Sequence, residues 1–453
     1  MDRIAPPGPS LLRERRFAPY FWTQALGAMN DNVFKVGFST LATYDALHYG
    51  ALAPSLAGLL ISACFVLPFI VFSATAGQLA DHFDKRRLIA WIKTSEVLIM
   101  LLAAFGFWQG QGAVLYLCML LMGLHSTFFG PVKYAFLPER LAPGQLLHGN
   151  ALVESSTFIA ILAGNLLGSI AALRGPPALA VLCLGLAVLG RLSASRIPAH
   201  APPAPELRLR FNPVAVTRES LRAVSSRALL ASLLGISWLW FVGATLLATV
   251  FAYASDTLHA DSTVVTLLLA LFSIGVGLGS ALCARLAPGR QALAMVVVSG
   301  AAMSLFILDF ALASLGYAPQ PGARATVLGF LSRPSGWRIA ADLFALSLAA
   351  GLYSVPLYTF MQARSPVAQR ARVVAANNVL NALFMVASSL LGLALGALGL
   401  PLGVLYLLLA GLSVGVVCAL YRMVPRFGRA TRLWLGRRRR RKPGASGAAP
   451  QAR

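Results

Sequence analysis

Long runs of apolar residues, separated by short groups of Gly, Pro and charged residues, dominate the chain. A run of about twenty apolar residues is long enough to cross a bilayer as a helix, and Gly, Pro and charge clusters mark where such helices end. We therefore predict an all-α, multi-pass membrane protein with twelve spans, at 17–45, 54–79, 87–109, 112–136, 150–173, 177–194, 228–254, 262–287, 291–313, 338–362, 372–398 and 400–424.

The composition narrows the class further. Hydrophobic residues make up 58% of the 453 positions and charged residues only 12%, which excludes a soluble globular protein. The formal charge of +23 is spread over the breaks and the tails and forms no stripe on one element, so we expect no nucleic-acid partner. All five cysteines lie inside apolar runs without metal-ligand spacing, and we expect no metal and no cofactor.

The placement of basic residues predicts the orientation. Of the 38 Lys and Arg, 31 fall in the two tails and in every second break, which are then cytoplasmic by the positive-inside rule. Residues 1–16 are polar and the first span is too long for a signal peptide, so the first span is expected to stay in the mature protein. We expect a protein of the bacterial cytoplasmic (inner) membrane with both termini in the cytoplasm.

The longest inner break divides the spans six and six. The predicted organisation is a tail at 1–16, a six-helix bundle at 17–194, a basic linker at 195–227, a second six-helix bundle at 228–424 and an Arg-rich tail at 425–453. Neither the linker nor the tail is long enough for a catalytic domain. We expect the arginines from Arg437 onward to lie on anionic headgroups of the bilayer.

The two halves share a weak internal repeat. Asn150-Ala-Leu-Val-Glu154 resembles Asn377-Asn-Val-Leu-Asn381, and Tyr134-Ala-Phe136 resembles Tyr358-Thr-Phe360. The offsets, 227 and 224 residues, agree within one short insertion. Six spans in each half give both halves the same orientation, which is the parallel-repeat arrangement of major facilitator transporters.

The loop after the second span resembles the signature loop of the major facilitator superfamily. It carries Gly77, Asp81 and the basic run Lys85, Arg86 and Arg87. The resemblance implies a close helix approach at Gly77. It also implies a gating contact between Asp81 and the amino-terminal end of the eleventh span, near Arg372. The family's usual Gly before the basic run is Asp84 here, and the stretch Gly279 to Arg285 of the second half lacks the acid. The alternative is a plain basic turn.

Within that superfamily, four stretches resemble the lysophospholipid transporters, including the transporter part of acyltransferase-fused members. They are Met29 to Asn32, Gly130 to Glu139, Asn150 to Thr157 and Arg370 to Leu391. The resemblance implies alternating-access transport of a lysophospholipid, lysophosphatidylethanolamine above all, by a monomer whose first, fourth and fifth spans line the cavity. Because no His-x4-Asp acyltransferase signature occurs, any acyltransferase would be a separate protein. The seventh span carries no charge, which departs from some members of the family.

Four charged residues inside the spans are candidates for the substrate site. A charge near the bilayer midplane costs about 2.5 to 3.5 kcal/mol and usually faces a pathway. Asp31 and Lys35 share a face of the first span, Lys133 lies beside Gly130-Pro131, which we expect to loosen the fourth span, and Glu154 begins the fifth span. A lysine suits a phosphate and a carboxylate suits an ammonium. The alternative is that Asp31 pairs with Lys35, and Glu154 with Lys133, only to neutralise charge.

Three further positions complete the candidate site. Asn381 is the counterpart of Glu154 in the repeat, and Trp238 and Trp240 could line a groove for the acyl chain. Tryptophan also collects at bilayer interfaces without any role in binding. Lys93 and Glu96, one turn apart in the third span, are interpreted as a helix-stabilising pair near the inner surface.

Two other functions stay open on these residues. The signature loop does not select a substrate, so an exporter of drugs or other small solutes is the alternative within transport. A membrane enzyme acting on lipid is the alternative outside transport. It would need His, Asp or Cys gathered at one membrane face, whereas the six histidines are scattered along the chain.

Overall fold

The computed structural model describes residues 11–44, 54–286, 292–319 and 324–440, and these residues form twelve long helices. Each one corresponds to a predicted span: α1 (Ala18–Tyr44), α3 (Pro54–His82), α4 (Lys85–Gln109), α5 (Gly112–Arg140), α6 (Leu146–Leu173), α7 (Pro176–Ser195), α9 (Arg227–Ala252), α10 (Ser262–Leu286), α11 (Ala292–Leu315), α13 (Pro334–Arg364), α14 (Arg370–Ala397) and α15 (Leu402–Met423). Within the described residues, eleven helices are long and apolar enough to cross a membrane. The twelfth, α1, is less apolar because polar residues between Asn30 and Lys35 interrupt its apolar sequence, although the helix itself is continuous.

Three features differ from the expectation. The fourth span is not loosened at Gly130-Pro131, because α5 continues as one helix through Pro131 to Arg140. Gly130 instead lets Asn378 of α14 approach the backbone, where any Cβ would overlap the Asn378 amide. The linker contains an additional helix, α8 (Pro213–Arg222), whose Asn212 side chain accepts hydrogen bonds from Val214 N and Ala215 N at 3.1 and 3.2 Å.

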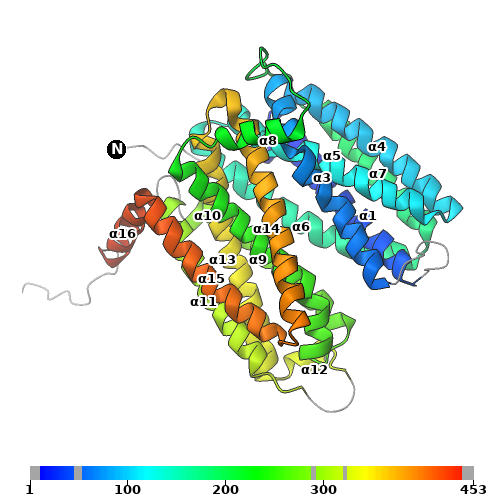
Figure 1. Ribbon diagram of the computed structural model, residues 1–453, viewed down its shortest axis with the longest axis vertical. Coiled ribbons are helices and arrows are strands. Elements are labelled where there is room, and N and C mark those ends of the chain that lie inside the picture. The colour runs from blue at the N-terminus through cyan, green and yellow to red at the C-terminus, as the bar shows by residue number, and fades with distance from the viewer. Residues whose placement is uncertain (1–10, 45–53, 287–291, 320–323, 441–453) are drawn as a thin grey trace, which may run out of the picture.

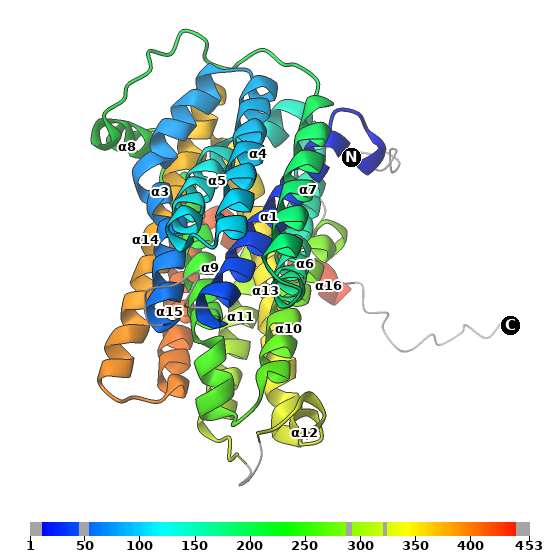
Figure 2. The same ribbon diagram turned by 90° about the vertical axis from the view of Figure 1, so that its right-hand side faces the viewer.

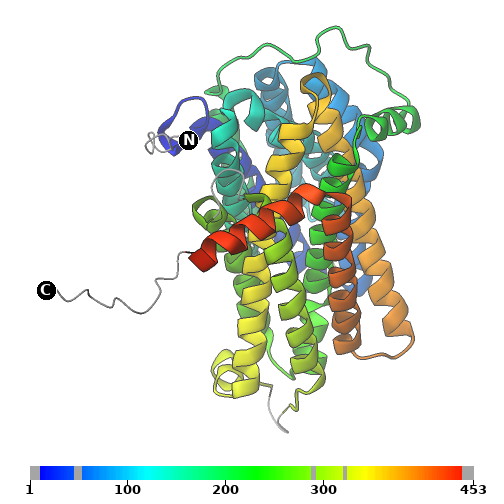
Figure 3. The same ribbon diagram turned by 90° about the vertical axis from the view of Figure 1, so that its left-hand side faces the viewer.

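The third difference is that the Arg-rich tail forms a helix, α16 (Pro425–Arg440). It crosses the second half of the molecule beside α11, as the red helix of Figure 3 shows. Phe427 is fully buried there and packs against Phe360 of α13 with ring centres 5.5 Å apart. Arg441 and Lys442, the last residues of the predicted basic run, lie outside the described residues.

The two halves pack by the same scheme. In the first bundle, α1 to α7, the contacting pairs are α1 with α6, α3 with α5 and α4 with α7, and in the second bundle, α9 to α15, they are α9 with α14, α10 with α13 and α11 with α15 (Figure 1). Glycines allow equivalent close approaches, at Gly123 against Phe65 of α3 and at Gly351 against Val276 of α10. Equivalent packing in the two halves agrees with the parallel repeat predicted from the sequence.

The molecule has two distinct ends. The linker with α8 lies at one end, called here the linker end, and the short helix α12 (Val327–Leu331) lies at the opposite end, called the far end (Figure 2). The two bundles contact each other mainly through two seams, α3 with α14 and α6 with α10. These seams position the groups described next.

Candidate functional site

The carboxylate of Asp81 connects the two bundles at the linker end. Asp81 is fully buried, and its Oδ1 accepts a hydrogen bond from Ala371 N at 2.9 Å. Its Oδ2 accepts from Arg372 N at 3.3 Å and from Arg372 Nε at 3.1 Å. The carboxylate therefore lies on the amino-terminal turn of α14, where unpaired N–H groups and the helix dipole favour a negative charge. The predicted contact between Asp81 and Arg372 is present.

Gly77 is the small residue that lets the two helices meet. A Cβ at this position would lie 2.6 Å from Ala375 Cβ and 3.0 Å from Ala371 O, so any larger residue would push α3 and α14 apart. Arg372 extends the contact to the linker, because its Nη1 donates to Glu219 of α8 at 3.2 Å. The α3 and α14 seam is thus an ionic contact shared by both bundles and the linker.

The basic run of the signature loop divides into one buried and two exposed residues. Lys85 is 2% exposed and donates to Glu139 Oε1 at 2.5 Å and to Ala80 O at 3.1 Å. Arg86 and Arg87 are exposed. Asp84, which stands where the family usually has Gly, caps α4 by accepting from Arg86 N at 3.0 Å. The departure from the family pattern therefore supplies a helix cap.

The second seam joins α6 to the other bundle without a charge. Ser155 Oγ donates to Gly277 O of α10 at 2.7 Å. Nearer the linker end, the amides of Asn150 and Gln362 of α13 exchange hydrogen bonds at 2.7 and 3.0 Å. Arg285, at the end of α10, is exposed, and the described residues contain no ion pair for it. The ionic contact is present at one seam only.

Asp31 and Lys35 do not form an ion pair in the described part of the chain. Asp31 Oδ2 accepts a hydrogen bond from Ser126 Oγ of α5 at 2.6 Å, while its buried Oδ1 has no partner. The ammonium nitrogen of Lys35 lies 5.9 Å from the centre of the Phe65 ring of α3. Direct neutralisation, one of the two interpretations of this pair, is therefore not what the structure shows.

Lys133 and Glu154 also have different hydrogen-bond partners, although both contact Tyr134, whose ring centre lies 5.3 Å from Lys133 Nζ. Lys133 Nζ donates to Thr157 Oγ1 of α6 at 2.7 Å, and Thr157 in turn donates to Gln24 of α1 at 3.1 Å. Glu154 is 3% exposed, and its Oε1 accepts from Tyr134 Oη at 2.5 Å. The ion pairs of the described residues include none between Lys133 and Glu154. A cation and an anion are thus kept apart on neighbouring helices.

Two tyrosines connect Glu154 to the second bundle. The rings of Tyr134 and Tyr358 are stacked, with centres 4.3 Å apart and planes inclined by 4°. Trp240 Nε1 of α9 donates to Tyr358 Oη at 3.2 Å. In the sequence, both tyrosines stand out only as markers of the repeat. The repeat could have predicted this contact. The two halves are related by an axis, and equivalent residues that lie close to this axis meet each other.

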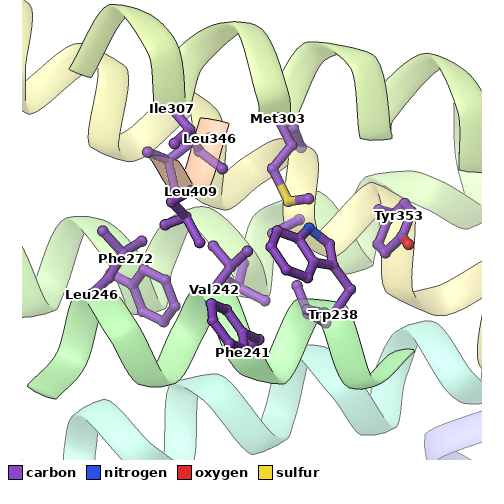
Figure 4. Packing of buried hydrophobic residues seen from close by; sticks show 14 of the residues in the cluster. Trp238, Phe241, Val242, Leu246, Phe272, Met303, Ile307, Leu346, Tyr353 and Leu409 are labelled. Carbon is purple, nitrogen blue, oxygen red and sulfur yellow. The ribbon is translucent and has the colours of Figure 1, made fainter. Parts of the chain in front are cut away.

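The two candidate tryptophans lie in different surroundings. Trp238 is 4% exposed, donates from Nε1 to Ser413 of α15 at 3.0 Å and stacks on Phe241 with ring centres 5.0 Å apart. Figure 4 shows its indole among apolar side chains of the second bundle, beside Met303. Residues two apart on a helix point in nearly opposite directions, so only Trp240 reaches the tyrosine pair. Asn381, 8% exposed, lies near it, with Ser237 Oγ at 2.9 Å and Trp240 Nε1 at 3.3 Å from its amide.

A buried network in the first bundle was not predicted as a site. Lys93 and Glu96 form the expected pair one turn apart, and both are at most 1% exposed, so the pair lies in the bundle core. Glu96 Oε2 accepts from Lys93 Nζ at 2.6 Å, and its Oε1 accepts from Asn30 Nδ2 at 2.8 Å. His125 Nε2 lies 3.4 Å from Glu96 Oε2. Asn30 and His125 precede Asp31 and Ser126, so this network fixes the helix positions that aim Asp31 at Ser126.

The arrangement can recognise a dipolar group. Asp31 and Glu154 supply negative charge and Lys133 supplies positive charge, each of which suits a group of the opposite sign. Lys133, Glu154 and the tyrosine pair sit on helices that contact the other bundle, α5, α6 and α13, whereas Asp31 lies on α1 and Trp240 on α9. No group of three or more metal-ligating side chains occurs in the described residues.

Comparison with known proteins shows what this architecture resembles. Residues 20–389 match the sequence family described as the Major Facilitator Superfamily. A lysophospholipid transporter of Serratia proteamaculans is 28% identical over 314 residues, which cover 67% of this chain and 75% of that protein. A lysophospholipid transporter of Klebsiella pneumoniae is 29% identical over 297 residues, which cover 64% and 70%.

Two solved structures share the fold at low identity. The E. coli fucose:proton symporter superposes with a TM-score of 0.66 at 13% identity, over 90% of this chain and 97% of that one. A bacterial homologue of the iron transporter ferroportin, in an outward-facing state, superposes with a TM-score of 0.61 at 14% identity, over 90% and 99%. The family match covers most of the chain, and the fold agrees with it. The chain therefore belongs to the Major Facilitator Superfamily and is a multi-pass secondary transporter with distant similarity to lysophospholipid transporters.

Proposed function

We propose that the protein moves lysophospholipids, with lysophosphatidylethanolamine as the favoured substrate, by alternating access across a bacterial cytoplasmic membrane. The observation that carries this proposal is the separation of charge at the bundle contact. Lys133 is bonded to Thr157 and Glu154 to Tyr134, so neither charge neutralises the other directly. A zwitterionic headgroup offers a phosphate to the lysine and an ammonium to a carboxylate. The similarity to lysophospholipid transporters supports the same substrate class.

The orientation follows from the basic residues. We place the linker end and both termini in the cytoplasm because most Lys and Arg lie in the tails and the linker-end loops. The Asp81 contact, the Ser155 contact and the Asn150 contact then all join the bundles on the cytoplasmic side. The described conformation is accordingly the outward-facing one, closed towards the cytoplasm, and transport requires these contacts to break.

The acyl chain has an apolar partner in the second bundle. The described residues of α9 after Arg227 carry no charge, and Trp240 projects from α9 towards the tyrosine pair. A lysophospholipid would place its headgroup against the first bundle and its chain against the second. We further propose that a monomer works without cofactor and supplies its substrate to a separate acyltransferase.

The test is transport in proteoliposomes, with labelled lysophosphatidylethanolamine and two matched variants. Asp31→Asn removes a charge at the proposed site, and Asp309→Asn removes one from an exposed ion pair with Arg338 near the far end. We expect at least a tenfold loss for Asp31→Asn, about 1.4 kcal/mol of binding, and normal transport for Asp309→Asn. Equal transport by the two variants, with equal protein levels, would remove Asp31 from the site.

An exporter of drugs or other small solutes is the alternative within the superfamily. The same liposomes loaded with a cationic dye discriminate between the two functions. Dye transport that lysophospholipid does not inhibit would favour the exporter. Lysophospholipid transport without dye transport would favour the proposal.

A further inference from the structure

A hollow lies on the outer surface of the first bundle, between α4 and α7 at the linker end. Its volume is about 460 Å³, and Asp84, Arg86, Arg87, Trp91, Thr94 and Arg191 line it. It is separate from the bundle contact: Lys93, which lies between Trp91 and Thr94 on α4, points into the bundle core and is fully buried. None of the groups proposed to meet the transported substrate lines this hollow.

Three arginines face the hollow without an acidic partner. The ion pairs of the described residues include none for Arg86, Arg87 or Arg191. Arg191 Nε donates to Thr94 Oγ1 at 2.8 Å, which orients its guanidinium group. The carboxylate of Asp84 also lines the hollow, where its Oδ1 accepts from Arg86 N at 3.0 Å and from His200 N at 3.4 Å, so three guanidinium charges against one carboxylate leave the hollow positively charged. Planar guanidinium groups that lack a carboxylate match the oxygens of a phosphate.

An apolar surface continues from the hollow towards the far end. On α4, Trp91, Leu98 and Phe105 are 55%, 60% and 47% exposed, and their spacing of seven residues places them on one face. On α7, which packs against α4, Leu189 and Leu192 are 54% and 55% exposed. Trp91 lies where the basic and apolar surfaces meet, which is the position that tryptophan favours at a membrane interface. A free phosphate would use only the arginines, whereas a phospholipid would use both surfaces.

We propose that this hollow binds the phosphate of an anionic membrane phospholipid, of the phosphatidylglycerol type, whose acyl chains lie along α4 and α7. The three arginines favour a lipid with net negative charge over a zwitterionic one. The bound lipid would join the start of α4, the end of α7 and the linker at Ala199. Arg86 and Arg87 lie in the first turn of α4, which directly follows α3 with Asp81, so the lipid would bind the helix that comes next along the chain after the contact at the linker end. The proposal concerns a resident lipid and does not rest on the transported substrate.

The experiment measures, by native mass spectrometry, the binding of phosphatidylglycerol and of phosphatidylcholine to the purified full chain. The test variants are Arg191→Gln, which leaves the signature loop intact, and the triple change Arg86→Gln, Arg87→Gln and Arg191→Gln. The matched control removes the same charge from exposed linker arginines, as Arg208→Gln, Arg210→Gln and Arg222→Gln. We expect phosphatidylglycerol binding to weaken about fivefold for each hollow arginine removed and to stay near its original value in the control.

Further arms identify the ligand and guard against misfolding. Trp91→Ala should also weaken phosphatidylglycerol binding, because it removes the apolar part of the site without changing charge. Inorganic phosphate should displace the lipid poorly. Displacement by phosphate as complete as by phosphatidylglycerol would show an ion site and overturn the proposal. Equal binding of the two lipids, or an equal loss in the hollow and control triple variants, would overturn it as well. Thermal unfolding of each variant verifies that the bundle is intact.

Discussion

The two bundles pack by the same scheme but differ in their interiors. The first bundle contains a fully buried ion pair, Lys93 with Glu96, and the separately held charges of Lys133 and Glu154. At the position equivalent to Glu154 the second bundle has Asn381, which is hydrogen-bonded to Ser237. Charges inside a membrane are expensive and are kept where they have a function. The difference supports the proposal that the first bundle binds the polar headgroup, while the second binds the acyl chain.

The two seams differ in the same way. The α3 and α14 seam depends on the carboxylate of Asp81, and the α6 and α10 seam depends on the hydroxyl of Ser155. The contact between a buried carboxylate and a helix terminus is strong in the absence of water and weakens once water reaches it. We therefore expect the ionic seam to control opening at the linker end, with the neutral seam as the more permanent contact.

The largest effect is expected inside the first bundle. Lys93→Met leaves Glu96 buried without its cation, and breaking a buried pair by removing one partner costs about 3 to 5 kcal/mol. The midpoint of thermal unfolding in detergent should fall sharply. Asn381→Ala, which removes a neutral hydrogen bond from the second bundle, should cost about 0.6 kcal/mol. Comparable losses for the two variants would mean that the bundles do not differ in this respect.

A double variant separates charge from packing at the same place. Lys93→Met with Glu96→Gln removes both charges, while the introduced glutamine side chain still reaches Asn30, so the double variant should recover most of the lost stability. If the double variant is less stable than Lys93→Met alone, the network is held by the shape of its side chains and not by the neutralised charge.

The second largest effect is expected for transport by Lys133→Gln. Glutamine can bond Thr157 but offers no charge to a phosphate. Lysophospholipid transport should fall about tenfold, equivalent to about 1.4 kcal/mol, without loss of folded protein. Because Lys133 and Glu154 have separate partners, adding Glu154→Gln should not restore activity. Recovery in the double variant would instead mean that the two residues only neutralise each other.

A moderate effect is expected for Asp81→Asn. The amide keeps the size of the side chain but loses its charge against the α14 terminus, a change of about 0.3 to 2 kcal/mol. The population should shift away from the conformation closed at the linker end. Cysteines placed at the far end of the bundles, labelled with a membrane-impermeant reagent, report this shift as reduced accessibility. Ser155→Ala at the neutral seam is the matched control and should change labelling less.

The sequence predicted the spans well because the two signals for a span, an apolar run and the Gly, Pro or charged residues that end it, depend only on residues adjacent in the chain. All twelve spans have a helix, and even the span at 177–194, preceded by two prolines, is present as α7 (Pro176–Ser195). The helices α8 and α16 were missed because both are polar and shorter than a membrane span. Pro131 was misinterpreted because α5 tolerates it without a break.

The candidate site was predictable in residue type but not in pairing. Asp31, Lys133 and Glu154 were identifiable because charges in spans are rare. Their partners Ser126, Thr157 and Tyr134 come from other helices or other turns, and hydroxyl residues are too common for a sequence to single them out. Asp81 is the exception, since a motif fixes both its position and the kind of helix end that it meets.

The smallest expected effect is the difference, about 0.9 kcal/mol, between variants of the two stacked tyrosines, one from each bundle. Tyr134→Phe and Tyr358→Phe both keep the ring stack and remove one hydroxyl each. Tyr134 Oη bonds a buried carboxylate, so its loss should cost about 1.5 kcal/mol or more, whereas Tyr358 Oη accepts from the neutral indole of Trp240 and its loss should cost about 0.6 kcal/mol. Thermal unfolding measures the two costs, and lysophospholipid transport measured in parallel should rank them in the same order. The reverse order would mean that Trp240 and the second bundle, and not Glu154, hold the polar end of the site in place.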